Sequence, residues 1–249
     1  MLKMTSLSVN INKIALLRNA RGHNYPDVST FAERCLQLGA HGITLHPRPD
    51  QRHATYRDVE QLYPLVVERY GRELNVEGYP GADFLQVVKR VRPTQCTLVP
   101  DDPAQLTSDH GWDLRGQETL LRRVIGELRQ EGVRVSLFVD YDNPDIARAA
   151  DLGADRVELY TEPYAESFGT PDNDAVLAGF RAAAKRAQAA GLGVNAGHDL
   201  NLDNLRTFLT IPAILEVSIG HALTVECLEH GIAYVIGAYL DIVNETRDD

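Results

Sequence analysis

The 249-residue sequence has few cysteines, no long apolar run and a deficit of positive charge. Its three cysteines, Cys35, Cys96 and Cys227, match neither a disulfide framework nor a zinc-binding spacing, so we expect buried thiols in a reducing compartment. No stretch approaches the roughly 18 apolar residues of a membrane span, and residues 1–9 lack the pattern of a signal peptide. The formal charge of −10 argues against nucleic-acid and anionic-membrane partners. Together these absences predict a cytoplasmic protein.

The overall composition is that of a globular protein. Hydrophobic residues make up 44% of the chain and charged residues 24%, which excludes a disordered or low-complexity protein. The length allows two ordinary domains or one large one. No Pro/Ser-rich linker or block of charge divides the chain, so we expect a single domain over residues 1–249.

Short apolar runs alternate with longer helical patterns along the whole chain, which predicts eight β-then-α units. This number of units at this length favours an α/β fold, a (β/α)₈ TIM barrel with extra helices in its loops, over an open doubly wound sheet. Long connections are expected at 13–26, 101–116 and 162–173. The predicted strands are 7–12, 42–47, 73–78, 95–100, 133–140, 155–161, 192–197 and 215–220. The predicted helices are 28–38, 56–69, 83–91, 117–131, 144–152, 174–190, 202–209 and 222–243.

Polar residues follow the carboxyl ends of several predicted strands, where barrel enzymes carry their chemistry. His46, Glu77 and His198 end three different strands and offer two imidazoles and a carboxylate for proton transfer near neutrality. For any one of them a structural role in a loop is as reasonable as catalysis, but their joint placement favours a catalytic group. Other polar residues at strand ends or in the following loops are Asn10, Asn12, Lys13, Arg48, Arg52, His53, Glu158, Asp199 and His221.

A near-repeat after strands seven and eight indicates a phosphate site. The segments Gly-His-Asp-Leu at 197–200 and Gly-His-Ala-Leu at 220–223 each place a glycine just before a helix N-terminus, which offers free N–H groups to an anion. The alternative is that each glycine only makes a tight turn. Arg21, Arg48 and Arg52 are candidates for a second anionic group. Paired carboxylates at ligand spacing are absent from the sequence, so we expect no metal.

Several motifs give the chain a family resemblance. VNINKIALLRNARG at 9–22, GITLHPRPDQRH at 42–53, VNAGHDL at 194–200 and SIGHAL at 218–223 resemble the pyridoxine 5′-phosphate synthase family, as do the shorter NVEG, LVPD and VSLFVD. The resemblance is collinear over essentially the whole chain. It implies a barrel with extra helices that assembles as an octamer. It also implies the condensation of 3-amino-2-oxopropyl phosphate with 1-deoxy-D-xylulose 5-phosphate, two phosphorylated substrates, by acid–base catalysis with no cofactor.

The resemblance also assigns roles to residues. It implies that His46 and Glu77 are catalytic bases and that His198 is the proton donor. The family often has Asp-His where this chain has Asn12-Lys13, and Gly where it has Asp199. The implied contacts of the aminoketone phosphate are Asn10, Arg21, Asp199, Gly220 and His221. Those of the pentulose phosphate are Asn12, Lys13, Arg48, His53 and Thr107.

Two alternatives stay open. The first is a Schiff-base aldolase acting on a ketose phosphate, with Lys13 as the nucleophile. It requires a buried lysine with a depressed pKa. The second is a non-enzymatic barrel that binds a phosphorylated metabolite, which would bind one phosphate ester tightly and form no product.

Overall fold

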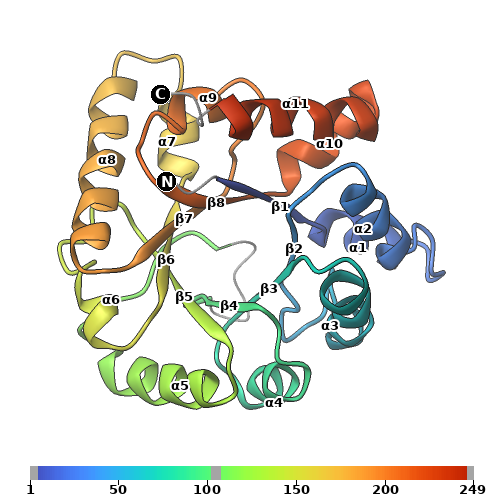
Figure 1. The fold of residues 1–249 in the computed structure, drawn as a ribbon, viewed down its shortest axis with the longest axis horizontal. Coiled ribbons are helices and arrows are strands. Elements are labelled where there is room, and N and C mark those ends of the chain that lie inside the picture. Colours follow the sequence, from blue (N-terminus) through green and yellow to red (C-terminus); the bar gives the residue numbers. More distant parts are fainter. Residues whose placement is uncertain (1–4, 102–107, 246–249) are drawn as a thin grey trace.

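The computed structural model describes residues 5–101 and 108–245, and in these residues eight parallel strands close into a barrel (Figure 1). Each strand pairs with the next one along the chain, and the last pairs with the first. This confirms the predicted (β/α)₈ fold. The strands are β1 (Ser6–Asn10), β2 (Gly42–Leu45), β3 (Glu73–Gly78), β4 (Gln95–Leu98), β5 (Arg134–Val139), β6 (Arg156–Tyr160), β7 (Gly193–Gly197) and β8 (Ile214–Ile219).

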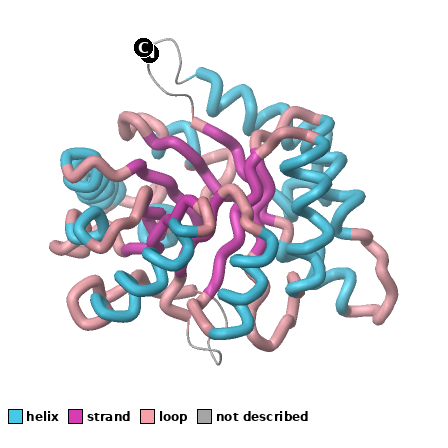
Figure 2. Tube along the Cα trace, turned by 60° about the horizontal axis from the view of Figure 1, so that its bottom comes forward, coloured by secondary structure: helices cyan, strands magenta, loops and turns pink. Residues whose placement is uncertain are grey.

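The helices surround the barrel and cover the outer face of its strands (Figures 1 and 2). Those before β5 are α1 (Asn12–Asn19), α2 (Val28–Gln37), α3 (Tyr56–Tyr63), the π-helix η1 (Pro64–Arg69), α4 (Ala82–Val91) and α5 (Glu118–Gln130). Those after it are α6 (Arg148–Asp151), α7 (Glu162–Ser167), α8 (Asn173–Ala189), α9 (Leu205–Phe208), α10 (His221–His230) and α11 (Ile232–Glu245).

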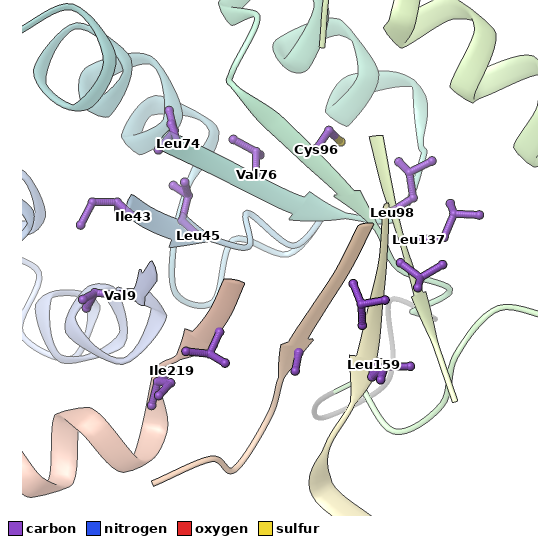
Figure 3. Close-up of a cluster of buried hydrophobic side chains, with 14 of the residues drawn as sticks. Val9, Ile43, Leu45, Leu74, Val76, Cys96, Leu98, Leu137, Leu159 and Ile219 are labelled. Carbon is purple, nitrogen blue, oxygen red and sulfur yellow. The ribbon is translucent and has the colours of Figure 1, made fainter. Parts of the chain in front are cut away.

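The apolar core lies between the strands and the helices. Side chains alternate between the two faces of a strand, and in this barrel the apolar ones point outward. Figure 3 shows Val9, Ile43, Leu74 and Leu159 projecting from four different strands, and all four are completely buried. Burial of these side chains therefore holds the surrounding helices against the barrel strands.

The inside of the barrel is polar, in contrast to the branched apolar residues that usually fill such barrels. Ser8 and Thr44 share a hydrogen bond of 2.7 Å between β1 and β2. Farther along, Gln95 on β4 donates to Glu216 on β8 at 3.5 Å, and such a contact between strands that are not neighbours has to cross the interior. The polar interior brings ionisable side chains beneath the carboxyl ends of the strands.

Several predicted elements need correction. The connection expected at 13–26 contains helix α1, which begins at Asn12 because β1 ends earlier, at Asn10. The helix expected at 56–69 changes to a π-helix at Pro64, because proline has no N–H to donate to the preceding turn. The helix expected at 222–243 is two helices, separated by Gly231 at a φ of +84°. The helices predicted at 144–152 and 202–209 are shorter than expected.

Other expectations concern burial. Cys35 and Cys96 are buried, whereas Cys227 is partly exposed, and all three are free thiols. Within the described part of the chain, no helix combines the length and the apolar character needed to span a membrane.

Candidate active site

The three predicted proton-transfer residues lie at one end of the barrel. The register pairs Leu45 with Val76, so the next residues lie side by side, His46 directly after β2 and Glu77 on β3. Both are buried. His198 follows β7, and its charged form is one of the positive groups that depress the pKa of His46. The fold thus brings the three residues into one electrostatic environment.

His46 is held as a neutral imidazole. Its backbone N–H donates to Asn12 Oδ1 at 2.9 Å, and its Nε2 lies 4.0 Å from Asp101 Oδ2. Burial, followed by the positive charges of His53 and Arg48, holds the pKa of His46 well below 6.5. At neutral pH the ring can therefore accept a proton, which is what the role of first base implied by the family resemblance requires.

Glu77 lies above a group of buried carboxyls. Burial raises its pKa well above 4.5, and the nearby carboxyls of Glu158 and Glu216 raise it further. A carboxyl in this setting holds its proton to higher pH and is a stronger base once it has lost it. A cationic amine beside it would favour the ionised form.

Glu158 is a buried acid with a raised pKa. Thr97 Oγ1 donates to Asn75 Oδ1 at 3.0 Å and to Glu158 Oε2 at 3.4 Å, and the second bond favours the ionised carboxylate. Burial and the neighbouring Glu216 outweigh this bond and raise the pKa of Glu158 to about 8. Burial likewise raises the pKa of Glu216 to about 7.

His198 sits in a strained turn. Both His198, at a φ of +87°, and Asp199, at +57°, adopt left-handed backbone conformations, which cost about 1–3 kcal/mol each for a residue other than glycine. Thr161 Oγ1 holds the turn by bonding the carbonyl of Gly197 at 2.7 Å and that of His198. Strain that is held in place at a strand end is typical of functional sites.

Aromatic rings surround the imidazole of His198. Its centroid lies 5.4 Å from that of Phe138 and 5.2 Å from that of Tyr160. Burial lowers the pKa of His198, whereas the carboxylates of Asp199 and Asp101 act in the opposite direction. An anionic group bound beside the ring would strengthen the second effect and favour the charged form, which is the form that can donate a proton.

The predicted pentulose phosphate residues lie beside His46. Arg48 Nη1 donates to Asp101 Oδ2 at 2.6 Å, and Ser108 Oγ bonds the same oxygen at 2.8 Å. Both members of the Arg48–Asp101 pair are buried. The importance of Asp101 was not apparent from the sequence, because its partner Arg48 lies 53 residues away.

His53 offers one defined donor to this region. Its ring lies 6.1 Å from that of His46, and its Nδ1 accepts the backbone N–H of Ala54 at 2.9 Å. Burial and the positive charge of Arg48 lower the pKa of His53 to about 4. The ring is therefore neutral, and its remaining proton lies on Nε2. The ammonium of Lys13 contributes to the lowered pKa of both His53 and His198, which places it in the same field.

The predicted aminoketone phosphate residues come together only in part. Gly220 directly precedes α10, and its α-carbon packs so closely on Asn10 that a β-carbon there would lie 3.0 Å from Asn10 Cβ. His221 is the first residue of the helix and is exposed, as is Asp199. Arg21 is exposed and follows the C-terminal end of α1, whereas Asn10 precedes its N-terminal end, so the helix length of about 12 Å separates the two residues. Thr107 lies outside the described residues.

Residues 5–101 and 108–245 contain no group of three His, Cys, Asp or Glu side chains arranged to hold a metal ion.

Fold and site together define an acid–base enzyme of the (β/α)₈ barrel class, with two imidazoles and a carboxyl at the carboxyl ends of its strands. Comparison with known proteins identifies the family: the model of the pyridoxal phosphate biosynthesis protein PdxJ matches residues 7–245, and the chain belongs to this family.

Individual relatives agree with this family. The chain is 54% identical over 249 residues to pyridoxine 5′-phosphate synthase of Xanthomonas axonopodis pv. citri (strain 306), a match that covers 96% of both chains. It is 51% identical over 255 residues to the enzyme of the same name from Xylella fastidiosa (strain M23), covering 99% of this chain and 98% of that one. The family predicted from the sequence motifs is therefore confirmed.

Solved structures show the same fold at much lower identity. A mutant tryptophan synthase α-subunit from Pyrococcus furiosus superposes with a TM-score of 0.63 at 14% identity, covering 98% of this chain and all (100%) of that one. N-(5′-phosphoribosyl)anthranilate isomerase from the same organism gives 0.58 at 12% identity, covering 97% and 99%. At such identity the likeness concerns the barrel alone.

Proposed function

We propose that the chain catalyses the pyridoxine 5′-phosphate synthase reaction. It joins 3-amino-2-oxopropyl phosphate to 1-deoxy-D-xylulose 5-phosphate and releases pyridoxine 5′-phosphate, inorganic phosphate and two waters. The observation that carries the proposal is the placement of His46, Glu77 and His198 at one end of the barrel, in a chain that belongs to the PdxJ family. The sum of substrates and products balances without an oxidant or reductant, so proton transfer is the chemistry that the protein has to supply.

The three groups suit different proton transfers. Addition of an amine to a ketone requires a base for the amine proton and an acid for the departing hydroxyl. Neutral His46 accepts the first kind of proton, and His198 donates the second when a bound phosphate favours its imidazolium form. Glu77, with its raised pKa, exchanges protons during the later loss of water and closure of the ring.

Two phosphorylated substrates need two separate anion sites. The pentulose phosphate is held near His46 by Arg48, His53 and Asn12, together with Lys13 and Thr107. Asn10, Gly220 and the free N–H groups that begin α10 hold the aminoketone phosphate, together with Arg21, Asp199 and His221. Binding both molecules between these sites makes the condensation effectively unimolecular.

The protein works as a homo-octamer in the cytoplasm, with two phosphorylated small molecules as substrates and neither nucleic acid nor membrane as a partner. Exposed apolar side chains support assembly with further copies. Leu16 and Leu17 on α1 are each nearly half exposed, and α1 packs beside α10, where Leu228 is 78% exposed. Exposed leucines on adjacent helices are typical of protein–protein interfaces.

The test is to mix the purified protein with both phosphorylated substrates and to follow pyridoxine 5′-phosphate by absorbance and released phosphate by colorimetry. Assays that omit one substrate serve as controls, and EDTA is present throughout. We expect equimolar product and phosphate only when both substrates are added. No product, with tight binding of one phosphate ester, would support a binding barrel instead. A requirement for a divalent ion would recast the histidines and Glu77 as metal ligands.

A further inference from the structure

The turn at 51–53, which carries His53, lies partly at the surface: Gln51 is exposed, and Arg52 and His53 are half-buried. Residue Gln51 in this turn adopts a φ of +50°, and a cavity of about 580 Å³ lies behind the turn, between α1 and α3. Polar side chains such as Asn19, Thr55 and Gln61 line this cavity. The position of the turn therefore depends on hydrogen bonds.

Asn19, the last residue of α1, provides these hydrogen bonds. Its side-chain amide donates to the backbone carbonyls of Gln51 at 3.4 Å, Arg52 at 3.0 Å and His53 at 2.8 Å. One amide thus binds three successive carbonyls, 32 to 34 residues away in the sequence.

Arg18 orients the amide of Asn19. Arg18 Nε donates to Asn19 Oδ1 at 3.1 Å, which directs the NH₂ group toward the carbonyls. Arg18 Nη2 also donates to the carbonyl of His53 at 3.3 Å and to Asp58 Oδ2 at 2.9 Å. Asp58 is in turn the capping-box partner of Thr55 at the start of α3. The amide is therefore held by a network anchored on a neighbouring helix.

Both ends of helix α1 carry residues that belong to, or contact, the region assigned to the pentulose phosphate. Asn12 and Lys13 occupy its first turn, and Asn19 its last. We propose that Asn19, oriented by Arg18, is a positioning residue for the pentulose phosphate: it holds the 51–53 turn so that His53 presents its Nε2–H to this substrate. The proposal rests on the proposed function, which assigns His53 to that substrate.

The substitution Asn19→Asp tests the proposal because it keeps the size of the side chain and removes its donors. A carboxylate still accepts from Arg18 but repels the three carbonyls. We expect the KM for 1-deoxy-D-xylulose 5-phosphate to rise about tenfold, as for loss of one or two hydrogen bonds, with kcat within about threefold. The KM for the aminoketone phosphate and the melting temperature stay unchanged. Gln61→Glu, the same chemical change in the same cavity, is the matched control and leaves both KM values unchanged.

A double-mutant cycle with His53→Ala separates this inference from the proposed function. If Asn19 acts through His53, Asn19→Asp changes the KM less than twofold in the His53→Ala background. Should His53→Ala raise the KM while Asn19→Asp does not, the positioning role is wrong and the assignment of His53 stands. If His53→Ala leaves the KM unchanged, the assignment itself is wrong. If Asn19→Asp lowers the melting temperature, the test uses Asn19→Ala instead, because alanine does not repel the carbonyls. An unchanged KM for the pentulose phosphate in Asn19→Ala overturns the positioning role.

Discussion

Asn12 Oδ1 accepts the backbone N–H of His46 at 2.9 Å, and this hydrogen bond ties the first turn of α1 to the residue proposed as the first base. The backbone N–H of Asn12 is itself bound by Asn10 Oδ1 at 3.0 Å. An aspartate at position 12 would accept the same N–H from His46. At position 12, asparagine in place of the aspartate that the resemblance implies therefore preserves this contact and changes only the charge.

Removing the acceptor at position 12 should impair catalysis. We expect Asn12→Ala to lower kcat about tenfold, because the N–H of His46 loses its partner and the ring is no longer held in place. Asn12→Asp, which keeps the acceptor, should stay within about threefold of wild type. Steady-state kinetics with both substrates saturating measures both values. Equal losses in the two variants would show that the contact does not position His46.

The three proton-transfer groups should each affect the rate far more than binding. His46→Ala, His198→Ala and Glu77→Gln are expected to lower kcat by about 10²–10⁴, the usual contribution of a general acid or base. KM should change much less, since these groups act mainly in the transition state. A variant that keeps more than half of the wild-type kcat would remove that residue from the mechanism.

The backbone at Asp199 explains why glycine suits this position. At a φ of +57° glycine is not strained, so Asp199→Gly should raise the free energy of unfolding by about 0.5–1 kcal/mol. It also removes a carboxylate that raises the pKa of His198. If protonated His198 is the donor, the alkaline limb of the kcat profile moves to lower pH. Asp199→Asn, which tolerates the same backbone, should give the pH shift with less stabilisation. An alkaline limb at the wild-type pH in both variants would rule out His198 as the donor.

The buried acid Glu158 should make stability depend on pH. In the folded protein its pKa is raised to about 8, so the folded state keeps a proton that the unfolded chain loses near pH 4.5. Between these values the folded state binds more protons, and stability falls as pH rises. Glu158→Gln should reduce this loss between pH 5.5 and 8.5 by at least about 1 kcal/mol, because one unit of pKa difference is worth about 1.36 kcal/mol.

Urea unfolding at the two pH values measures this effect. Glu68→Gln, on the exposed face of η1, is the surface control and should leave the pH dependence unchanged. The same loss of stability in Glu158→Gln and wild type would mean that Glu158 is already ionised at pH 5.5 in the folded protein.

The eight strands were predictable because their outward residues are apolar and are followed by helical patterns. Knowledge of the barrel then places His46, Glu77 and His198 at strand ends, where the structure has them. Helix α1 was missed because Leu16 and Leu17 are exposed on it, so its residues do not show the pattern of a helix packed on a core. The periodicity of apolar residues predicts helices that bury one face in the same molecule. It does not predict a helix that keeps apolar side chains at the surface.

The contacts that hold the site were not predictable for a different reason. Asp101 with Arg48, and Asn19 with the 51–53 carbonyls, join residues 32 to 53 positions apart through side-chain geometry that only the closed barrel creates. In contrast, the capping box of Thr55 and Asp58 is a local pattern that a reading of the sequence would have found. Local capping follows from sequence spacing, whereas buried polar networks follow from the tertiary structure.

Lys13 is the clearest departure from the family pattern, and its role can be tested directly. Lysine brings a fixed positive charge with three donors and no acceptor, whereas the histidine that is frequent here can exchange a proton. Among the described residues no carboxylate forms an ion pair with Lys13, so pairing at the barrel rim does not account for it. Its charge instead lowers the pKa of both His53 and His198.

We therefore expect Lys13 to attract the pentulose phosphate without transferring protons. Lys13→Met, which keeps the length of the side chain, should raise the KM for that substrate and make it less sensitive to salt, with kcat within about tenfold. Lys13→Arg, which keeps the charge, should retain the salt dependence. KM measured at low and high ionic strength distinguishes these results. A collapse of kcat at unchanged KM in both variants would contradict the electrostatic role. It would indicate a Schiff-base nucleophile, which requires the lysine amine itself. Borohydride trapping in the wild type would then identify the adduct on Lys13.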